Sequence, residues 1–298
     1  KAYCLDFNWG GRRSFADPGT WKDADPKAHV DWHKAMGGNV IQTFCVSSNG
    51  WAWYKGGPVP EQPGLKHDFL REVVELGHEE GMLVMGYFCI AANTRWGRDN
   101  PDLSYGTPST YHIPYTDEYL AYLNTAIGHA VKSTGIDGFM IDWVWQPRRQ
   151  STEGKWIEAE KKLYEQLMGE PFPGEDKLTG QQDLDYSRKA IDRCWKTIRV
   201  AAKNADPNCI IWLTSIHLNH PHVTDTDMYW YVVDIDAAGP VLTFTFDRKL
   251  IDDPLDLYWQ VLLGVERFDS GDDEEMEGDA YPDEGEPPAL YRLGATGW

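Results

Sequence analysis

The sequence is poor in cations and in long apolar runs, and it lacks the common nucleotide-binding motifs. Its 298 residues carry 28 Lys and Arg against 47 Asp and Glu, which gives a formal net charge of −19 at pH 7. This charge opposes binding to the phosphates of DNA or RNA and to anionic membranes. No stretch reaches the roughly 18 consecutive apolar residues of a membrane span. Neither a GxGxxG motif after the first apolar run nor a Walker A motif occurs, so a nucleotide-binding fold has no support.

Cysteine is also scarce, and its spacing excludes its usual structural roles. The five Cys form no CxxC pair, and their odd number does not divide into disulfides. Cys4, Cys45 and Cys89 fall in or at the end of apolar runs, and Cys194 falls in a helical pattern. We therefore expect small buried side chains at these positions, and no disulfide framework or zinc site.

Short apolar runs alternate with helical patterns along most of the chain. Strands are predicted at 2–9, 39–46, 82–90, 137–143, 209–214, 228–234 and 241–246, with a weaker eighth at 265–268. Helices are predicted at 24–36, 66–81, 116–133, 156–168, 183–204 and 254–264. Strands separated by helices imply right-handed βαβ units and a parallel sheet. Seven or eight such units favour the α/β class and a closed (β/α)8 TIM-type barrel with outer helices.

The predicted barrel domain covers residues 1–268, and residues 269–298 form an acidic loop and C-terminal tail that could take part in closing the barrel. The stretch 269–288 is the one compositional outlier, and its acidity is typical of a solvated segment. A calcium loop is a weaker alternative, because the DxDxDG spacing is missing. The chain begins without Met, almost directly in a strand, so either a signal peptide has been removed or the sequence is trimmed. We expect an extracellular or periplasmic location.

Asp142 is the first candidate for a catalytic group. In IDGFMIDWVWQP (136–147) an apolar run of strand type ends at this acid, and Trp143 and Trp145 follow at once. A carboxylate closing a buried strand is costly unless it opens into a polar cleft. In βα-barrels the carboxyl ends of the strands carry the chemistry. The alternative is an Asp that caps the following loop or helix.

Other polar and aromatic residues gather at the predicted strand ends. A sugar needs hydrogen-bonding partners for its hydroxyls and a flat apolar surface for its ring face, so this pattern favours a carbohydrate cleft. We expect a carbohydrate partner, oligo- or polysaccharide, with no nucleic acid, membrane or cofactor. The predicted substrate-binding residues are Asp6, Asn8, Trp9, Asn49, Trp51, Trp53, Asn93, Trp96, Trp143, Trp145, His217 and His220.

Hydrolysis of a glycosidic bond needs a second carboxyl group. A retaining enzyme places the two about 5–5.5 Å apart, and an inverting enzyme about 6.5–9.5 Å apart to admit a water. Asp234, at the end of the sixth predicted strand, is the first candidate for the acid. Rivals for this role are Asp225, Asp227, Asp236 and Glu266.

Two further clusters leave alternatives open. His217, His220 and His222 invite a metal-site hypothesis, but Pro221 and the late position in the chain fit poorly, so we expect sugar hydrogen bonding or a plain loop. A second cluster could meet an acidic sugar or a sulfate, although ordinary surface charge is the preferred interpretation. It consists of Lys55, Arg95 and Arg98.

The order of FCVSSNGWAWY, PGLKHDFLREVVELGHEEGMLVMGYF and IDGFMIDW resembles the first half of α-L-fucosidase-type glycoside hydrolase barrels and their glycosidase-like relatives. The resemblance covers about residues 1–147. It implies a retaining mechanism on an α-linked sugar, with Asp142 as nucleophile. The family's His-His-Asp-Gly-Phe type motif, which grips the sugar, corresponds to residues 47–51, where Gly50 and the aromatic Trp51 remain but both His are replaced by Ser. This departure puts fucose in question and leaves a second function class open, a non-catalytic carbohydrate-binding barrel.

Overall fold

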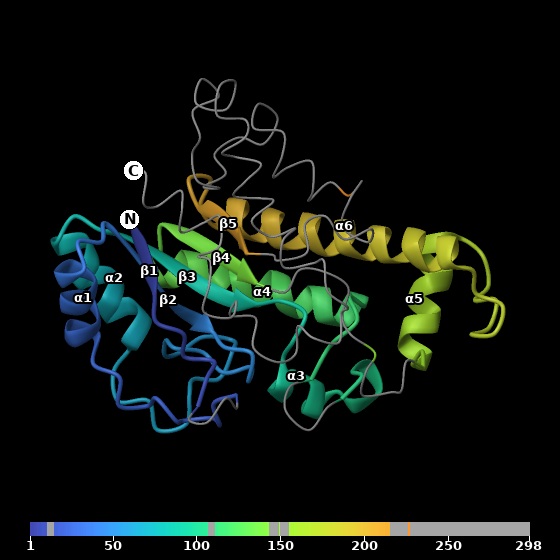
Figure 1. Ribbon diagram of the computed structural model, residues 1–298, viewed down its shortest axis with the longest axis horizontal. Helices are drawn as coiled ribbons and strands as arrows, with labels where there is room; N and C mark the ends of the chain where they lie inside the picture. Colours follow the sequence, from blue (N-terminus) through green and yellow to red (C-terminus); the bar gives the residue numbers. More distant parts are fainter. Residues whose placement is uncertain (11–14, 107–110, 143–148, 150–154, 215–225, 227–298) are drawn as a thin grey trace, which may run out of the picture.

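A single parallel sheet forms the centre of the computed structural model, which describes residues 1–10, 15–106, 111–142, 149, 155–214 and 226 (Figure 1). Its five strands are hydrogen-bonded in chain order. They are β1 (Ala2–Cys4), β2 (Val40–Val46), β3 (Leu83–Cys89), β4 (Gly138–Asp142) and β5 (Ile210–Thr214). Cys89, Asp142 and Thr214 share one register level, so three neighbouring strands end together at the carboxyl edge.

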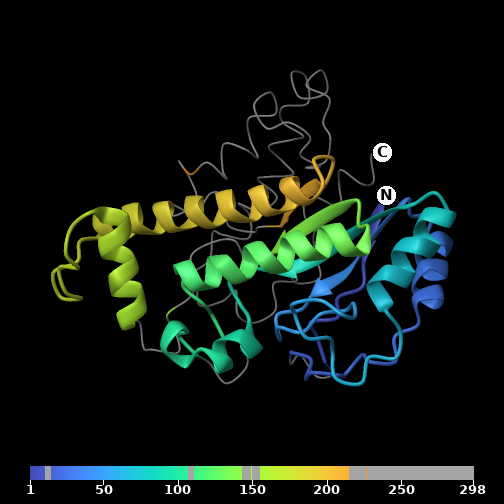
Figure 2. The same ribbon diagram turned by 180° about the vertical axis from the view of Figure 1, so that it is seen from behind.

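Helices follow the strands in the order expected for βα units. They are α1 (Pro26–Ala35), α2 (Phe69–Glu79), α4 (Asp117–Thr134), α5 (Glu158–Met168) and α6 (Gly180–Ala205). Two shorter helices, α3 (Thr94–Asp99) and η1 (Pro101–Leu103), lie between β3 and α4. Helix α4 covers one face of the sheet and packs along α6, as the two opposite views show (Figures 1 and 2).

The helix boundaries follow from local capping. Asp25 accepts a hydrogen bond from the Ala28 amide at 2.9 Å and precedes Pro26, a favourable first residue for α1. Helix α4 ends at Gly135, whose φ of 76° suits glycine. Helix α6 begins with a capping box between Thr179 and Gln182.

The hydrophobic core lies between the sheet and its helices. At Gly77, α2 approaches β2 and β3 so closely that an added Cβ would stand 2.9 Å from Val84 Cγ2. Val84 therefore faces the helices. Because side chains alternate along a strand, Tyr87 faces the opposite side of the sheet. The interior side chains of a barrel would occupy that side.

The alternation of strands and helices that the sequence predicts is confirmed for the first five strands. The first strand is shorter than predicted, at Ala2–Cys4 instead of 2–9, because the Asp6 carboxylate accepts the Asn8 amide at 2.8 Å and turns the chain. Helix α3 lies where no helix or strand was predicted. The described part of the sheet is open. The later predicted strands, the helix at 254–264 and the boundary at 268 lie outside the described residues.

All five cysteines are free thiols. Cys45, Cys89 and Cys194 are buried, as predicted. Cys4 is exposed, and the prediction of burial was wrong there, because β1 pairs with β2 alone within the described sheet. Within the same residues, no helix combines the length and hydropathy needed to cross a membrane.

Candidate functional site

A chain of hydrogen bonds joins the carboxyl ends of β1, β2, β3 and β4. The Tyr87 hydroxyl donates to Asp142 Oδ2 at 2.7 Å. Asn8 Nδ2 donates to the same phenol oxygen at 2.9 Å, and Asn8 Oδ1 accepts the Ser48 amide, also at 2.9 Å. This network fixes the half-buried Asp142 carboxylate at the edge where parallel α/β folds place their chemistry.

Tyr87 acts as a hydrogen-bond donor because its own proton is firmly held. Complete burial raises the pKa of Tyr87 well above its usual value, and the charge of nearby Asp142 raises it further. The neutral phenol can therefore give its hydrogen to the carboxylate at any ordinary pH. The sequence offered no clear indication of this role, since Tyr87 sits inside the apolar run of β3.

Asp6 is a second carboxyl group near this network. The protein around it removes water from its carboxylate and raises its pKa, although the residue as a whole stays exposed. The pKa shifts of Tyr87 and Cys89 both include contributions from Asp6 and Asp142, so the two acids flank the same buried groups. A raised pKa shifts a carboxyl group toward the role of a general acid, which must hold a proton before it can donate one.

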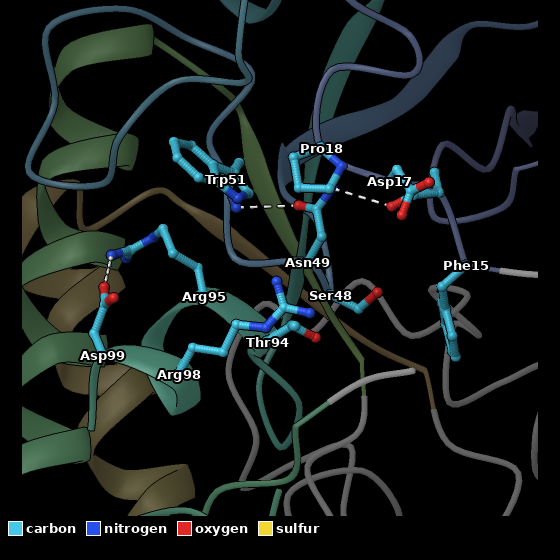
Figure 3. A pocket seen from close by; sticks show the side chains of 11 residues that line it. Phe15, Asp17, Pro18, Ser48, Asn49, Trp51, Thr94, Arg95, Arg98 and Asp99 are labelled. Atoms are coloured by element: carbon cyan, nitrogen blue, oxygen red, sulfur yellow. Dashed lines mark hydrogen bonds and ion pairs between the residues drawn. The ribbon is translucent and has the colours of Figure 1, made fainter. Parts of the chain in front are cut away.

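A cavity of about 530 Å³ lies beside the strand ends (Figure 3). Its walls come from residues 15–18, 48–51 and 94–99, which follow β1, β2 and β3. The predicted ligand residues Asn49 and Trp51 both line it, and Asn49 Oδ1 accepts the Trp51 amide at 3.1 Å. Ser48 connects the cavity to the Asp142 network through its amide.

An aromatic surface adjoins this cavity. Trp9 is 45 % exposed and stacks on Phe15 with ring centroids 4.8 Å apart. Phe15 also lines the cavity. Trp21 donates its indole hydrogen to the Trp9 carbonyl at 3.0 Å, which ties a second exposed Trp to the first. Trp9 is thus placed where the sequence prediction requires, on an open surface at a strand end.

Trp53 does not face a cleft, contrary to the prediction. It is 1 % exposed, its indole donates to Ser47 Oγ at 2.6 Å, and its ring packs on Phe7 with centroids 4.7 Å apart. Phe44 of β2 and Phe69 of α2 also pack against this ring, so the side chain is part of the core. A direct contact with a dissolved sugar is therefore excluded by its burial.

Asn93 and Trp96 also have structural positions where ligand contacts were predicted. Asn93 is 1 % exposed and caps α3 by accepting the Trp96 amide at 2.9 Å. Trp96 is 7 % exposed and packs on Tyr119, with centroids 4.8 Å apart. Together they hold α3 against α4, and α3 in turn carries the arginines of the cavity.

The remaining predicted site residues lie outside the described residues and stay predictions. They are Trp143, Trp145, His217, His220 and Asp234, together with the rival acids Asp225, Asp227, Asp236 and Glu266 and the third histidine, His222. Among the residues that are described, no group of three or more His, Cys, Asp or Glu could hold a metal ion.

Comparison with known proteins finds a partial family match and similarities in fold. Residues 25–143, which include β2, β3, β4 and Asp142, match the family model described as "Hypothetical glycosyl hydrolase 6". The chain is similar in structure to alpha-L-fucosidase isoenzyme 2 from Paenibacillus thiaminolyticus, with a TM-score of 0.55 and 18 % identity over 72 % of this chain and 32 % of that one. The present chain thus spans about a third of the length of that protein.

Two further structures are similar at lower scores. A hypothetical protein from Ruminiclostridium thermocellum has a TM-score of 0.43 and 14 % identity over 63 % of this chain and 90 % of that one. An alpha-L-fucosidase from Bacteroides thetaiotaomicron has a TM-score of 0.38 and 15 % identity over 64 % of this chain and 34 % of that one. No curated protein matches the chain. The family match and the first structural similarity support a glycosidase-like parallel α/β fold.

Proposed function

We propose that this chain is a glycoside hydrolase that cleaves an α-linked sugar, α-L-fucoside-like or related, from a glycan. The observation that carries the proposal is the Asp142 carboxylate, which Tyr87 holds at the carboxyl edge of the sheet and which is linked through Tyr87 and Asn8 to Ser48 in the cavity wall. A positioned carboxylate at such an edge is the group that glycoside hydrolysis requires.

In this proposal the mechanism is retaining. The Asp142 carboxylate attacks the anomeric carbon and forms a glycosyl ester while a second carboxyl group protonates the leaving oxygen; water then hydrolyses the ester. Asp234 is the acid that the strand order favours. Asp6 is a competing choice, because its raised pKa and its position near Tyr87 suit a proton donor.

We further propose that the sheet closes into a (β/α)8 barrel through the predicted strands at 228–234, 241–246 and 265–268. The strand order β1 to β5 supports this, since a barrel wall also places its strands side by side in chain order. Both β1 and β5 present an edge in the described sheet to which later strands could pair.

The second candidate is a carbohydrate-binding barrel without catalysis. The observation that favours it is the pair Ser47 and Ser48, which stands where the resembled family has two histidines that grip the sugar. Both serines are buried, at 2 % and 3 % exposure, and Ser47 Oγ accepts the Trp53 indole hydrogen at 2.6 Å, so Ser47 belongs to the packed interior and not to a sugar site.

Hydrolysis of aryl α- and β-glycosides, with plain and sulfated oligosaccharides, separates these candidates. Asp142→Asn should lower the turnover of any substrate by about a thousandfold or more, because it removes the nucleophile. Asp137→Asn is the matched control at the opposite end of β4, where the carboxylate accepts the Val84 amide at 2.8 Å; it should lower stability but keep the activity of the folded protein.

Two parallel variants, Asp6→Asn and Asp234→Asn, identify the acid. Loss of the general acid lowers activity on ordinary glycosides, but lowers it less on an aryl glycoside whose leaving group departs without protonation. Full activity of Asp142→Asn would refute the assigned nucleophile. Saccharide binding without turnover, equal in wild type and Asp142→Asn, would establish the second candidate.

A further inference from the structure

We propose that the cavity lined by residues 15–18, 48–51 and 94–99 binds an anionic group carried by a sugar, either a carboxylate or a sulfate ester. The proposal rests on the proposed function in that the ligand is a saccharide. It does not require Asp142 to be catalytic, because Asp142 is not among the lining residues.

Arg98 supplies the positive charge. Among the residues that the structure describes, its guanidinium forms no ion pair and no hydrogen bond. It makes a cation–π contact with Tyr111, in which the guanidinium carbon lies 5.8 Å from the ring centroid. Figure 3 shows this side chain extending from α3 toward Ser48 and Asn49. An uncommitted guanidinium in a cavity is suited to a carboxylate or sulfate, which it can meet with two parallel hydrogen bonds.

The other charges of the cavity leave Arg98 available. Arg95 is committed, because its Nε donates to the Gly50 carbonyl at 2.8 Å and its Nη1 lies 3.0 Å from Asp99. Asp99 is thereby neutralised. The remaining acid, Asp17, is exposed and lies on the far side of Pro18 and Asn49 from Arg98 (Figure 3). The net charge of −19 makes most of the protein surface repel anions. The positive charge of Arg98 makes this cavity a place where an anion could bind.

Ser48 provides an independent indication of a ligand. It is 3 % exposed and lines the cavity, yet its hydroxyl has no hydrogen-bond partner among the residues whose positions are described. Because Ser48 lines the cavity, this hydroxyl is open to a ligand or a water there. An anionic oxygen is a strong acceptor for it, and the bond would be charge-assisted.

The walls of the cavity suit a sugar as the carrier of the anion. Trp51 and Phe15 offer ring faces, and Asn49 offers an amide. The volume of about 530 Å³ falls within the range of small-molecule sites. A free inorganic anion would use Arg98 and Ser48 but not these aromatic walls.

Calorimetric titration tests the proposal with the full chain. The probes are a glucuronate-containing oligosaccharide, a sulfated galactose oligosaccharide, an uncharged oligosaccharide of equal length, and sodium sulfate and glucuronate alone. We expect one charged oligosaccharide to bind about tenfold or more tightly than the uncharged one, and the better of the two identifies the anion. Arg98→Gln should remove most of this preference, and Ser48→Ala should weaken binding about threefold or more.

Arg199→Gln is the matched control, because it removes the same charge from the exposed surface of α6. Equal binding of charged and uncharged oligosaccharides, or an Arg98→Gln variant that keeps the preference, overturns the proposal. Binding of free sulfate or glucuronate as tight as that of the oligosaccharide also overturns it, since the sugar would then contribute nothing. If only uncharged glycosides are hydrolysed, and Asp142 is needed, the anion-binding proposal fails and the hydrolase proposal stands. If acidic sugars bind without turnover, the anion-binding proposal stands and the hydrolase proposal fails.

Discussion

Tyr87 is the residue on which the orientation of Asp142 most directly depends. It donates to the carboxylate at 2.7 Å and receives the Asn8 amide hydrogen at 2.9 Å. Tyr87→Phe removes the donor but keeps the ring. We expect kcat/KM on the best substrate to fall about 10- to 100-fold, because the carboxylate loses a fixed direction and a stabilising hydrogen bond. The acidic limb of the pH–activity profile should also move to higher pH, since hydrogen bonds to a carboxylate favour its charged form.

Tyr164→Phe is the control for this experiment. Tyr164 is fully buried in α5, and its hydroxyl donates to Glu170 at 3.1 Å, far along the chain from the sheet edge. Both variants should lose about 1 kcal/mol of unfolding free energy, but Tyr164→Phe should keep its activity. Equal activity losses in the two would show that Tyr87 acts through stability alone.

His29 gives the pH dependence of stability a specific origin. It is 5 % exposed in α1, and burial, reinforced by the neighbouring His33, lowers its pKa from 6.5 to about 3. The folded state keeps His29 neutral, whereas the unfolded chain binds a proton below about pH 6.5. The contribution of neutral His29 to the free energy of unfolding is therefore complete above pH 6.5. It is lost as the pH falls toward 3, at up to about 1.4 kcal/mol per pH unit.

In His29→Gln, which cannot titrate, the loss of unfolding free energy between pH 7.5 and 4.5 should be smaller than in wild type. Urea unfolding at the two pH values measures this, with His78→Gln, an exposed histidine, as control. If His29→Gln loses as much unfolding free energy between the two pH values as wild type, the acid sensitivity comes from the carboxylates and not from His29.

At the scale of elements, a buried ion pair joins α5 to the segment that follows β4. Arg149 donates to both carboxylate oxygens of Glu160, at 2.6 and 2.9 Å, and Glu160 is fully buried. The guanidinium also lies 3.8 Å from the centroid of the Trp156 ring. Burial alone would lower the pKa of Arg149, but the hydrogen bonds and charge of Glu160 outweigh it and raise that pKa, so the guanidinium is ionised. Burial raises the pKa of Glu160, and the hydrogen bonds and charge of Arg149 oppose that rise.

Glu160→Gln should lower the unfolding free energy by about 3 kcal/mol, because it leaves the buried guanidinium with only the longer ion pair to Asp183, at 3.4 Å. The double variant Glu160→Leu with Arg149→Met should recover much of this loss, since it removes both charges together. Urea unfolding of the single and double variants measures the coupling. A loss below about 0.5 kcal/mol in Glu160→Gln would mean that water reaches the pair.

The sequence predicted elements better than it predicted the roles of single residues. Apolar runs of strand length alternate with amphipathic helices, and this pattern survives in β1 to β5. In β2, β3 and β4 burial on both faces of the sheet demands such runs. Helix α3 was missed because six residues carry too little periodicity; it depends on the Asn93 cap and on the packing of Trp96. Trp51 and Trp53 are two residues apart and equal in sequence terms, yet only tertiary contacts decide that one lines a cavity and the other fills the core.

At the scale of the whole molecule, the excess of acidic residues destabilises the folded state through repulsion between many charges. A net charge of −19 makes the compact state repel itself, and the unfolded chain relieves this repulsion by expanding. Added salt screens such repulsion, because the Debye length falls from about 30 Å at 0.01 M to about 8 Å at 0.15 M. Exposed ion pairs such as Lys27–Asp31 weaken in salt as well, but each contributes little.

We therefore expect the unfolding temperature to rise by a few degrees between about 10 and 150 mM NaCl, since roughly 1 kcal/mol shifts the Tm of a large domain by about 2–4 °C. KCl at equal ionic strength should give the same rise, because screening depends on ionic strength and not on the identity of the cation. A larger rise with CaCl2 at matched ionic strength would indicate cation binding by the acidic surface. A Tm that falls with NaCl would show that attractive ion pairs stabilise the folded state by more than the net repulsion destabilises it.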